Sequence, residues 1–206
     1  YQLMFLVGLR GGLLDRRFLD PVDSLGGVSG DVRRERAGAR EGASSLASAR
    51  PMSNYVNGLD LSFSRADAPW WAARKGEGFS AMSQCLDTGG VEVNQLLRPT
   101  AERNLMDALS VGFHISGYLN ASPWKSGQTA VQHAETTAGQ AWAHIPVLWV
   151  DIEIDGLTEA RIRETCVAAK ATGKAVGCYS ARWYWNKLGN PMWPWLTEYS
   201  LWVAQY

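Results

Sequence analysis

The sequence predicts an α/β fold in which strands and helices alternate. Short apolar runs alternate with helical stretches from residue 53 to residue 206, as a β/α architecture requires. The segment VLWVDIE contains a nearly continuous apolar run, which is typical of a strand buried on both faces of a parallel sheet. Periodicity alone leaves a β/α barrel and a doubly wound sheet as alternatives.

The first part of this region predicts three strands and one helix. Residues 56–63 (VNGLDLSF) form a strand that ends in polar residues, and residues 77–85 form a weaker one. Residues 99–111 begin with Pro-Thr and place three apolar side chains on one face, which predicts a helix. Residues 113–121 (FHISGYLNA) then return as a strand.

The second part contains the most distinct elements. Residues 127–143 are predicted to be helical, and residues 145–154 are the clearest strand. Residues 158–173 are the clearest helix, with Thr158 as its N-cap and Gly173 as its stop. Two further strands are expected at 174–180 and 200–206, with RWYWNKLG between them as a short helix or a loop.

Residues 1–52 differ in composition from the rest. The first fifty residues contain no tryptophan and no lysine but eight arginines, and they are rich in Gly, Ala and Ser. Such a segment buries too little apolar surface to offset its ordering entropy, so we expect disorder and at most a short helix. The apolar run QLMFLVGL lacks the preceding positive charges of a signal peptide. We interpret 1–52 as a natural arm or as upstream sequence joined to a domain that spans 53–206.

Composition excludes several classes of function. The 20 Lys and Arg residues balance the 20 Asp and Glu residues, so no basic surface suited to nucleic acid is expected. No apolar run approaches the roughly 18–20 residues of a transmembrane helix. The chain has no metal-binding His spacing and no nucleotide-binding motif, so we expect neither a metal nor a cofactor. The three cysteines are expected to be buried or reduced thiols: Cys85, Cys166 and Cys178.

Three acidic residues are the candidates for catalysis. Asp151 and Glu153 end the most apolar strand, and residues two apart on a strand face the same side. Asp60 ends another strand in the same way. Active sites of β/α barrels lie at the carboxyl ends of the strands, where neighbouring carboxyl groups raise one another's pKa and supply a proton donor. The alternative for Asp151 and Glu153 is a solvated strand end, and the alternative for Asp60 is a turn residue after a strand.

Aromatic residues are the candidates for binding sugars. All ten tryptophans fall between Trp70 and Trp202. We expect about two-thirds of them to be structural and the others to line a glycan cleft, because sugar rings stack on aromatic faces. The tryptophans predicted in loops or short connectors are Trp70, Trp71, Trp124, Trp183, Trp185, Trp193 and Trp195. Three tyrosines lie near the ends of predicted strands: Tyr118, Tyr179 and Tyr206.

The chain resembles glycoside hydrolase family 25, the lysozymes of phage endolysins and bacterial autolysins. The resemblance rests on five segments that occur in this order: GLDLS, GYLNAS, PVLWVDIE, GKAVGCYS and LWVAQY. The resemblance implies an irregular, TIM-like β/α barrel that cleaves the β-1,4 bond between N-acetylmuramic acid and N-acetylglucosamine. Glu153 would be the general acid, Asp151 would orient the substrate or stabilise developing charge, and Asp60 would assist. The implied substrate contacts are Tyr118, Tyr179, Trp183, Trp202, Gln205 and Tyr206.

The chain departs from the family pattern in two places. Leu119 and Asn120 stand where the family usually has a histidine, and the family continues past Tyr206 to a further strand with a late aspartate. We therefore expect a C-terminally truncated barrel without its last strand. The expected partner is bacterial peptidoglycan, and the protein is expected to be a monomer. We expect it to act on the cell wall as an antimicrobial endolysin that is released by a phage holin. The alternatives are an inactive glycan-binding barrel and a hydrolase of another glycan such as chitin.

Overall fold

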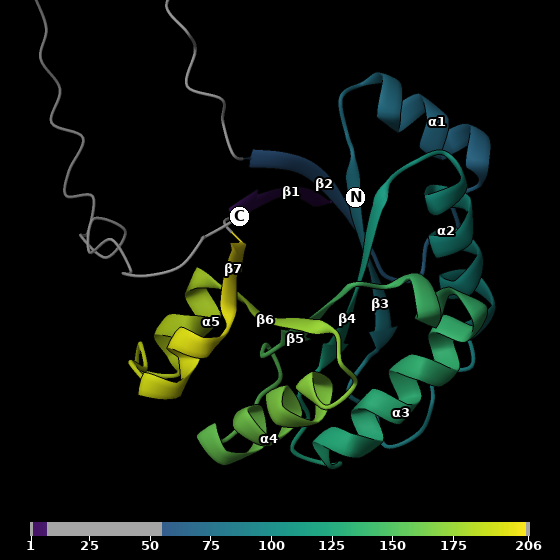
Figure 1. The fold of residues 1–206 in the computed structure, drawn as a ribbon. Helices are drawn as coiled ribbons and strands as arrows, with labels where there is room; N and C mark the ends of the chain where they lie inside the picture. Colours follow the sequence, from purple (N-terminus) through teal and green to yellow (C-terminus); the bar gives the residue numbers. More distant parts are fainter. Residues whose placement is uncertain (1, 8–54, 205–206) are drawn as a thin grey trace, which may run out of the picture. The chain divides into compact units, whose positions relative to one another are not determined.

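The structure is a computed structural model that describes residues 2–7 and 55–204 (Figure 1). Its strands form one sheet in which neighbours follow the order of the chain. The strands are β1 (Gln2–Val7), β2 (Tyr55–Leu61), β3 (Ala81–Asp87), β4 (His114–Asn120), β5 (Val147–Asp151), β6 (Ala175–Ala181) and β7 (Ser200–Ala204). From β2 to β7 every pair is parallel. These strands curl into a half-barrel with helices between them, which confirms the predicted barrel-like α/β class and excludes the doubly wound order.

The helices are α1 (Ala68–Gly76), α2 (Arg98–Ser110), α3 (Gly127–Ala138), α4 (Glu159–Lys170) and α5 (Arg182–Lys187), with 3-10 segments η2 (Gly139–His144) and η3 (Pro194–Glu198). Helices α2 and α3 pack against β3 and β4, and α4 packs against β5 and β6. Because the parallel strands all point the same way, their carboxyl ends meet at one edge of the sheet, which positions the candidate site. Among the described helices, none is both long and apolar enough to cross a bilayer.

Most predicted elements are present within a few residues of their expected bounds. The side chain of Thr158 accepts a hydrogen bond from the backbone N–H of Arg161, as expected for the N-cap of α4. Gly173, past the end of this helix, has a φ of 79°, as its role as a stop requires. The predicted helix 127–143 is instead α3 followed by the tighter segment η2.

Helix α1 was not predicted, and it overturns the placement of two tryptophans in a loop. Asp67 caps it by accepting a hydrogen bond from the backbone N–H of Trp70, and a proline occupies its first turn. Trp71 is fully buried against Phe113 in the core. Trp185 lies in α5 and the buried Trp195 in η3, so these two tryptophans also belong to regular elements.

The apolar run near the start of the chain is a strand instead of the short helix that we considered. Gln2–Val7 forms β1, which pairs antiparallel with β2 and so covers the edge of the parallel sheet. The edge of β2 offers unpaired backbone groups, and β1 pairs with them. The rest of the predicted N-terminal segment lies within residues 8–54, outside the described part of the chain.

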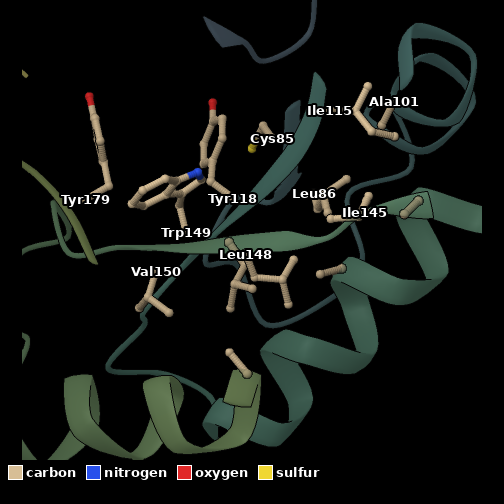
Figure 2. Close-up of a cluster of buried hydrophobic side chains, with 14 of the residues drawn as sticks. Cys85, Leu86, Ala101, Ile115, Tyr118, Ile145, Leu148, Trp149, Val150 and Tyr179 are labelled. Carbon is tan, nitrogen blue, oxygen red and sulfur yellow. The ribbon is translucent and has the colours of Figure 1, made fainter. Parts of the chain in front are cut away.

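The two faces of the sheet have different environments. Figure 2 shows Leu148 and Val150 of β5 pointing toward the helices, whereas Trp149 of β5 points to the opposite side with Tyr118 and Tyr179. Leu148 and Val150 are fully buried in the hydrophobic core. The inner face of the half-barrel therefore carries large aromatic side chains beneath the edge at which the acidic residues lie.

Candidate active site

A cavity of about 150 Å³ lies at the carboxyl edge of the sheet. Its lining residues come from the ends of β2, β4, β5, β6 and β7: Asp60, Ser62, Tyr118, Asp151, Tyr179 and Trp202. Five of these were predicted as site residues, and the structure brings them together. Ser62 was not singled out as a site residue, although it lies two residues after Asp60, where the alternation of a strand would have placed it on the same face.

Asp151 is the last residue of β5 and is 7% exposed. Its carboxylate accepts a hydrogen bond of 3.0 Å from the backbone N–H of Glu153. This bond from an aspartate to the residue two positions on is an Asx-turn, which ends the strand and redirects the chain. Glu153 is thus positioned by this turn and not by the alternation of a continuing strand, which corrects the predicted geometry of the pair.

Glu153 reaches toward the end of the neighbouring strand β6. Its carboxylate accepts a short hydrogen bond from the backbone N–H of Ala181. Partial burial raises the pKa of Glu153, and the bond from Ala181 lowers it by a smaller amount. Glu153 is not among the residues that line the cavity, but its negative charge raises the pKa of both Asp60 and Asp151. The three predicted acids therefore form one electrostatic group.

The carboxyl groups of this cluster favour the protonated form more than isolated acids do. Burial raises the pKa of Asp60 from 3.8 to about 6; the charge of Glu153 adds to this increase, and the hydroxyl of Tyr118 opposes it. Burial, followed by the charge of Glu153, raises the pKa of Asp151 well above 3.8. One oxygen of Asp60 is buried without a hydrogen-bond partner. The cluster can therefore hold at least one proton near neutral pH.

Tyr118 connects the acids to the polar groups around them. Its hydroxyl lies 2.8 Å from the hydroxyl of Ser62. Burial raises the pKa of Tyr118, so the phenol stays neutral. Burial also raises the pKa of the nearby Cys85 thiol to about 12, which excludes a thiolate nucleophile at this position. Cys166 and Cys178 are likewise buried free thiols, as predicted for all three cysteines, and their sulfur atoms lie 3.6 Å apart.

Aromatic rings form one wall of the cavity. The ring of Trp202 lies edge-on to Tyr179, with centroids 4.5 Å apart, and edge-on to Trp149 at 5.4 Å. Gly177 leaves the space that the ring of Trp149 fills, since a Cβ atom at this position would overlap that ring. Trp149 is not a lining residue of the cavity, but its ring supports that of Trp202, which is one.

Of the three other predicted contacts, the structure describes only one. Trp183 begins α5 after β6 and is 57% exposed, with its ring against Tyr184; it is not a lining residue of the cavity. Gln205 and Tyr206 are outside the described residues. Asn120 pairs in register with Asp151, and its buried amide oxygen has no hydrogen-bond partner.

A buried ion pair that the sequence analysis missed supports the loops at this edge. Asp87 at the end of β3 lies 2.6 Å from the ammonium group of Lys125, and both side chains are almost fully buried. His133 of α3 contacts Asp87 at 3.6 Å and Lys125 at 3.3 Å. The sequence signal for this ion pair was Asp87 itself, an acidic residue at the end of a strand, which is the same signal that singled out Asp60. Within the described residues no group of three or more His, Cys, Asp and Glu side chains is arranged to hold a metal ion.

The fold resembles solved structures whose sequences are distant. No protein-family profile and no curated protein sequence matches the chain. The muramidase from Acremonium alcalophilum is 18% identical with a TM-score of 0.58, and 73% of this chain covers 77% of that chain. The muramidase from Trichobolus zukalii is also 18% identical, with a TM-score of 0.56, and the match again covers 73% of this chain and 77% of that chain. A glycosyl hydrolase 25 of Streptococcus pneumoniae, described as a virulence factor participating in host cell invasion, is 12% identical with a TM-score of 0.55, and 72% of this chain covers 68% of it. The chain therefore has a fold similar to that of muramidases and of a family 25 glycosyl hydrolase.

Proposed function

We propose that the protein is a glycoside hydrolase that cleaves bacterial peptidoglycan at the β-1,4 bond between N-acetylmuramic acid and N-acetylglucosamine. The observation that carries this proposal is the cluster of Asp60, Asp151 and Glu153 at the rim of a small aromatic cavity. Glycoside cleavage needs a carboxylic acid that keeps its proton near neutral pH and a second carboxylate nearby. The similar folds of muramidases support the choice of substrate.

Glu153 is the proposed general acid. It is more accessible than the nearly buried Asp151, and burial raises its pKa, so it can deliver a proton to the glycosidic oxygen of a bound chain. Its position is fixed at two points, the Asx-turn at Asp151 and the N–H of Ala181. A proton donor held in this way loses little entropy when the substrate arrives.

Asp151 and Asp60 complete the proposed chemistry. Asp151 orients the substrate and stabilises the positive charge that develops at the sugar carbon, and it can assist the substrate's own N-acetyl group as the nucleophile. Asp60 contributes a carboxyl group from β2, near the hydroxyl groups of Tyr118 and Ser62. Trp202 and Tyr179 provide flat surfaces on which a sugar ring can stack.

The test is the release of reducing ends from purified peptidoglycan. We expect wild type to release them with N-acetylmuramic acid at the new reducing end, and Glu153→Gln to be about 10²–10⁴ times slower. Glu135→Gln, on the outer helix α3, is the matched control and should keep the wild-type rate. Equal rates for wild type and Glu153→Gln would refute the assignment of the acid. Binding to peptidoglycan without any release would instead identify a glycan-binding barrel, and preferential release from chitin would identify a chitin hydrolase.

A further inference from the structure

Exposed aromatic side chains gather at the edge of the sheet that carries the cavity. Among the described side chains, three aromatic ones are exposed: Phe63, Trp124 and Trp183, at 52%, 63% and 57%. Phe63 closely follows β2, Trp124 follows β4 and Trp183 follows β6. All three therefore lie beyond the carboxyl ends of parallel strands. Trp183 is one of the substrate contacts that the resemblance implies, whereas Trp124 has no assigned role.

The cavity is too small to hold more than part of a glycan chain. Its volume of about 150 Å³ lies below the roughly 300–1,000 Å³ of pockets that enclose a drug-sized ligand. A polymeric substrate that places one bond next to Glu153 must therefore continue over the surface at the rim. Flat aromatic side chains on that surface are suited to contact the faces of the next sugar rings.

The loop that carries Trp124 packs beside the segment that carries Glu153. A Cβ atom added at Gly156, three residues after Glu153, would lie 3.8 Å from Pro123. Ile154, which directly follows Glu153, packs against Gly89 so closely that a side chain at Gly89 would overlap it. The residue that precedes Trp124 thus lies next to the segment that follows Glu153, which places the exposed ring near the proposed catalytic cluster.

The backbone around Trp124 is held firmly although its ring is exposed. The hydroxyl of Ser122 accepts a hydrogen bond from the backbone N–H of Trp124 and donates one of 2.6 Å to the carbonyl of Gly89. On the other side, Lys125 is bound to the buried carboxylate of Asp87 and donates a hydrogen bond of 2.7 Å to the carbonyl of Gly90. A ring presented by a fixed backbone binds a ligand with little loss of conformational entropy.

We propose that Trp124 is a stacking platform for a sugar ring of the glycan chain, outside the cavity and on the side of β4. This inference rests on the proposed function, because it assigns the path of a polymeric substrate past the same site. The ligand class is a chain of N-acetylated amino sugars. The Lys125–Asp87 ion pair is a positioning element that keeps the platform in place.

The test compares ligands of increasing length. Glycan strands of two, four and six sugars, freed of their peptides, are titrated by calorimetry into the full chain carrying Glu153→Gln, so that no ligand is cleaved. We expect the affinity to rise with length, and Trp124→Ala to reduce the gain from the shortest to the longest ligand by about tenfold. Trp124→Phe keeps an aromatic face and should retain most of the gain. Val167→Ala, an exposed side chain on α4, should leave the gain unchanged.

The outcomes separate this inference from the proposed function. An unchanged gain in Trp124→Ala, or an equal loss for all three ligands, overturns the platform. Thermal melting of each variant shows whether a loss of binding follows a loss of fold, and recovery in Trp124→Phe excludes this explanation. Hydrolysis is measured separately in proteins that retain Glu153. Absence of hydrolysis together with a gain that depends on Trp124 refutes the enzyme but keeps the platform. Absence of binding by the Glu153→Gln protein overturns the platform, and if hydrolysis is absent as well, it refutes both.

Discussion

Replacing Asp60 by asparagine should stabilise the folded protein at neutral pH. Burial and the charge of Glu153 raise the pKa of Asp60 from 3.8 to about 6 in the folded state. In the unfolded chain the same carboxyl group has its ordinary pKa. A difference of about two pKa units corresponds to about 3 kcal/mol. This is the largest amount by which ionisation of Asp60 destabilises the folded protein, and the amide of asparagine removes it.

The pH dependence distinguishes this effect from a general change in packing. Because the folded pKa is the higher one, the folded state binds more protons between about pH 4 and pH 6, and its stability falls as the pH rises through this window. Below pH 4 both states are largely protonated and the penalty is absent. The advantage of Asp60→Asn should therefore grow from near zero below pH 4 to about 2–3 kcal/mol at pH 7.5.

The assay is unfolding in urea at pH 3.5, 5, 6 and 7.5, with the free energy of unfolding compared between wild type and variant. Asp107→Asn, on helix α2 outside the cavity, is the matched control because it makes the same exchange away from the acidic cluster. The same variant at position 60 should lose activity in the reducing-end assay. A difference between wild type and Asp60→Asn that is the same at every pH, or a variant less stable than wild type at pH 7.5, would refute the reasoning.

Two further predictions concern packing and charge. Gly177→Ala should lower the stability by about 1–3 kcal/mol, because the added methyl group overlaps the tryptophan ring beside it; Gly76→Ala, with open space around its Cβ position, is the control, and thermal melting compares the two. Lys125→Met should lower the stability by up to about 3–5 kcal/mol, because it removes the cation closest to the buried carboxylate of Asp87 and leaves only the more distant His133 beside it. The double variant Lys125→Met with Asp87→Leu should recover much of this loss in urea unfolding, and failure to recover would show that the carbonyl contacts of Lys125 matter more than its charge.

The fold class and the position of the acids could be predicted because both depend on local patterns. The apolar run before Asp151 indicates a buried strand, and the polar residue that ends it marks the edge at which parallel strands present their side chains. The same logic identified Asp60 from a short strand. In both cases the cost of burying a carboxylate in a core makes the end of the strand the favourable place for it.

Features that depend on contacts between distant segments could not be predicted in the same way. Helix α1 was missed because tryptophans are poor helix formers, and the burial of Trp71 against Phe113 stabilises the helix more than propensity opposes it. The placement of Glu153 depends on an Asx-turn and on a backbone N–H of β6. The pairing of Asp87 with Lys125 joins residues 38 positions apart, and no local pattern indicates it.

Asp87 and the proposed catalytic cluster are buried acids at the same edge of the sheet with different partners. Asp87 is as deeply buried as Asp151, but a lysine neutralises it. Within the described part of the chain, no basic side chain forms an ion pair with Asp60, Asp151 or Glu153. The fold therefore supplies a cation to a buried acid at a neighbouring strand end, whereas no basic side chain of residues 2–7 and 55–204 forms such a pair with the acids at the cavity. Burial raises the pKa of Asp87 as well, but Lys125 and His133 oppose this increase, whereas the acids at the cavity raise one another's pKa and so favour a bound proton at a cost in stability. The expected gain in stability of Asp60→Asn measures part of that cost, and the loss of activity in the same variant would show what the cost maintains.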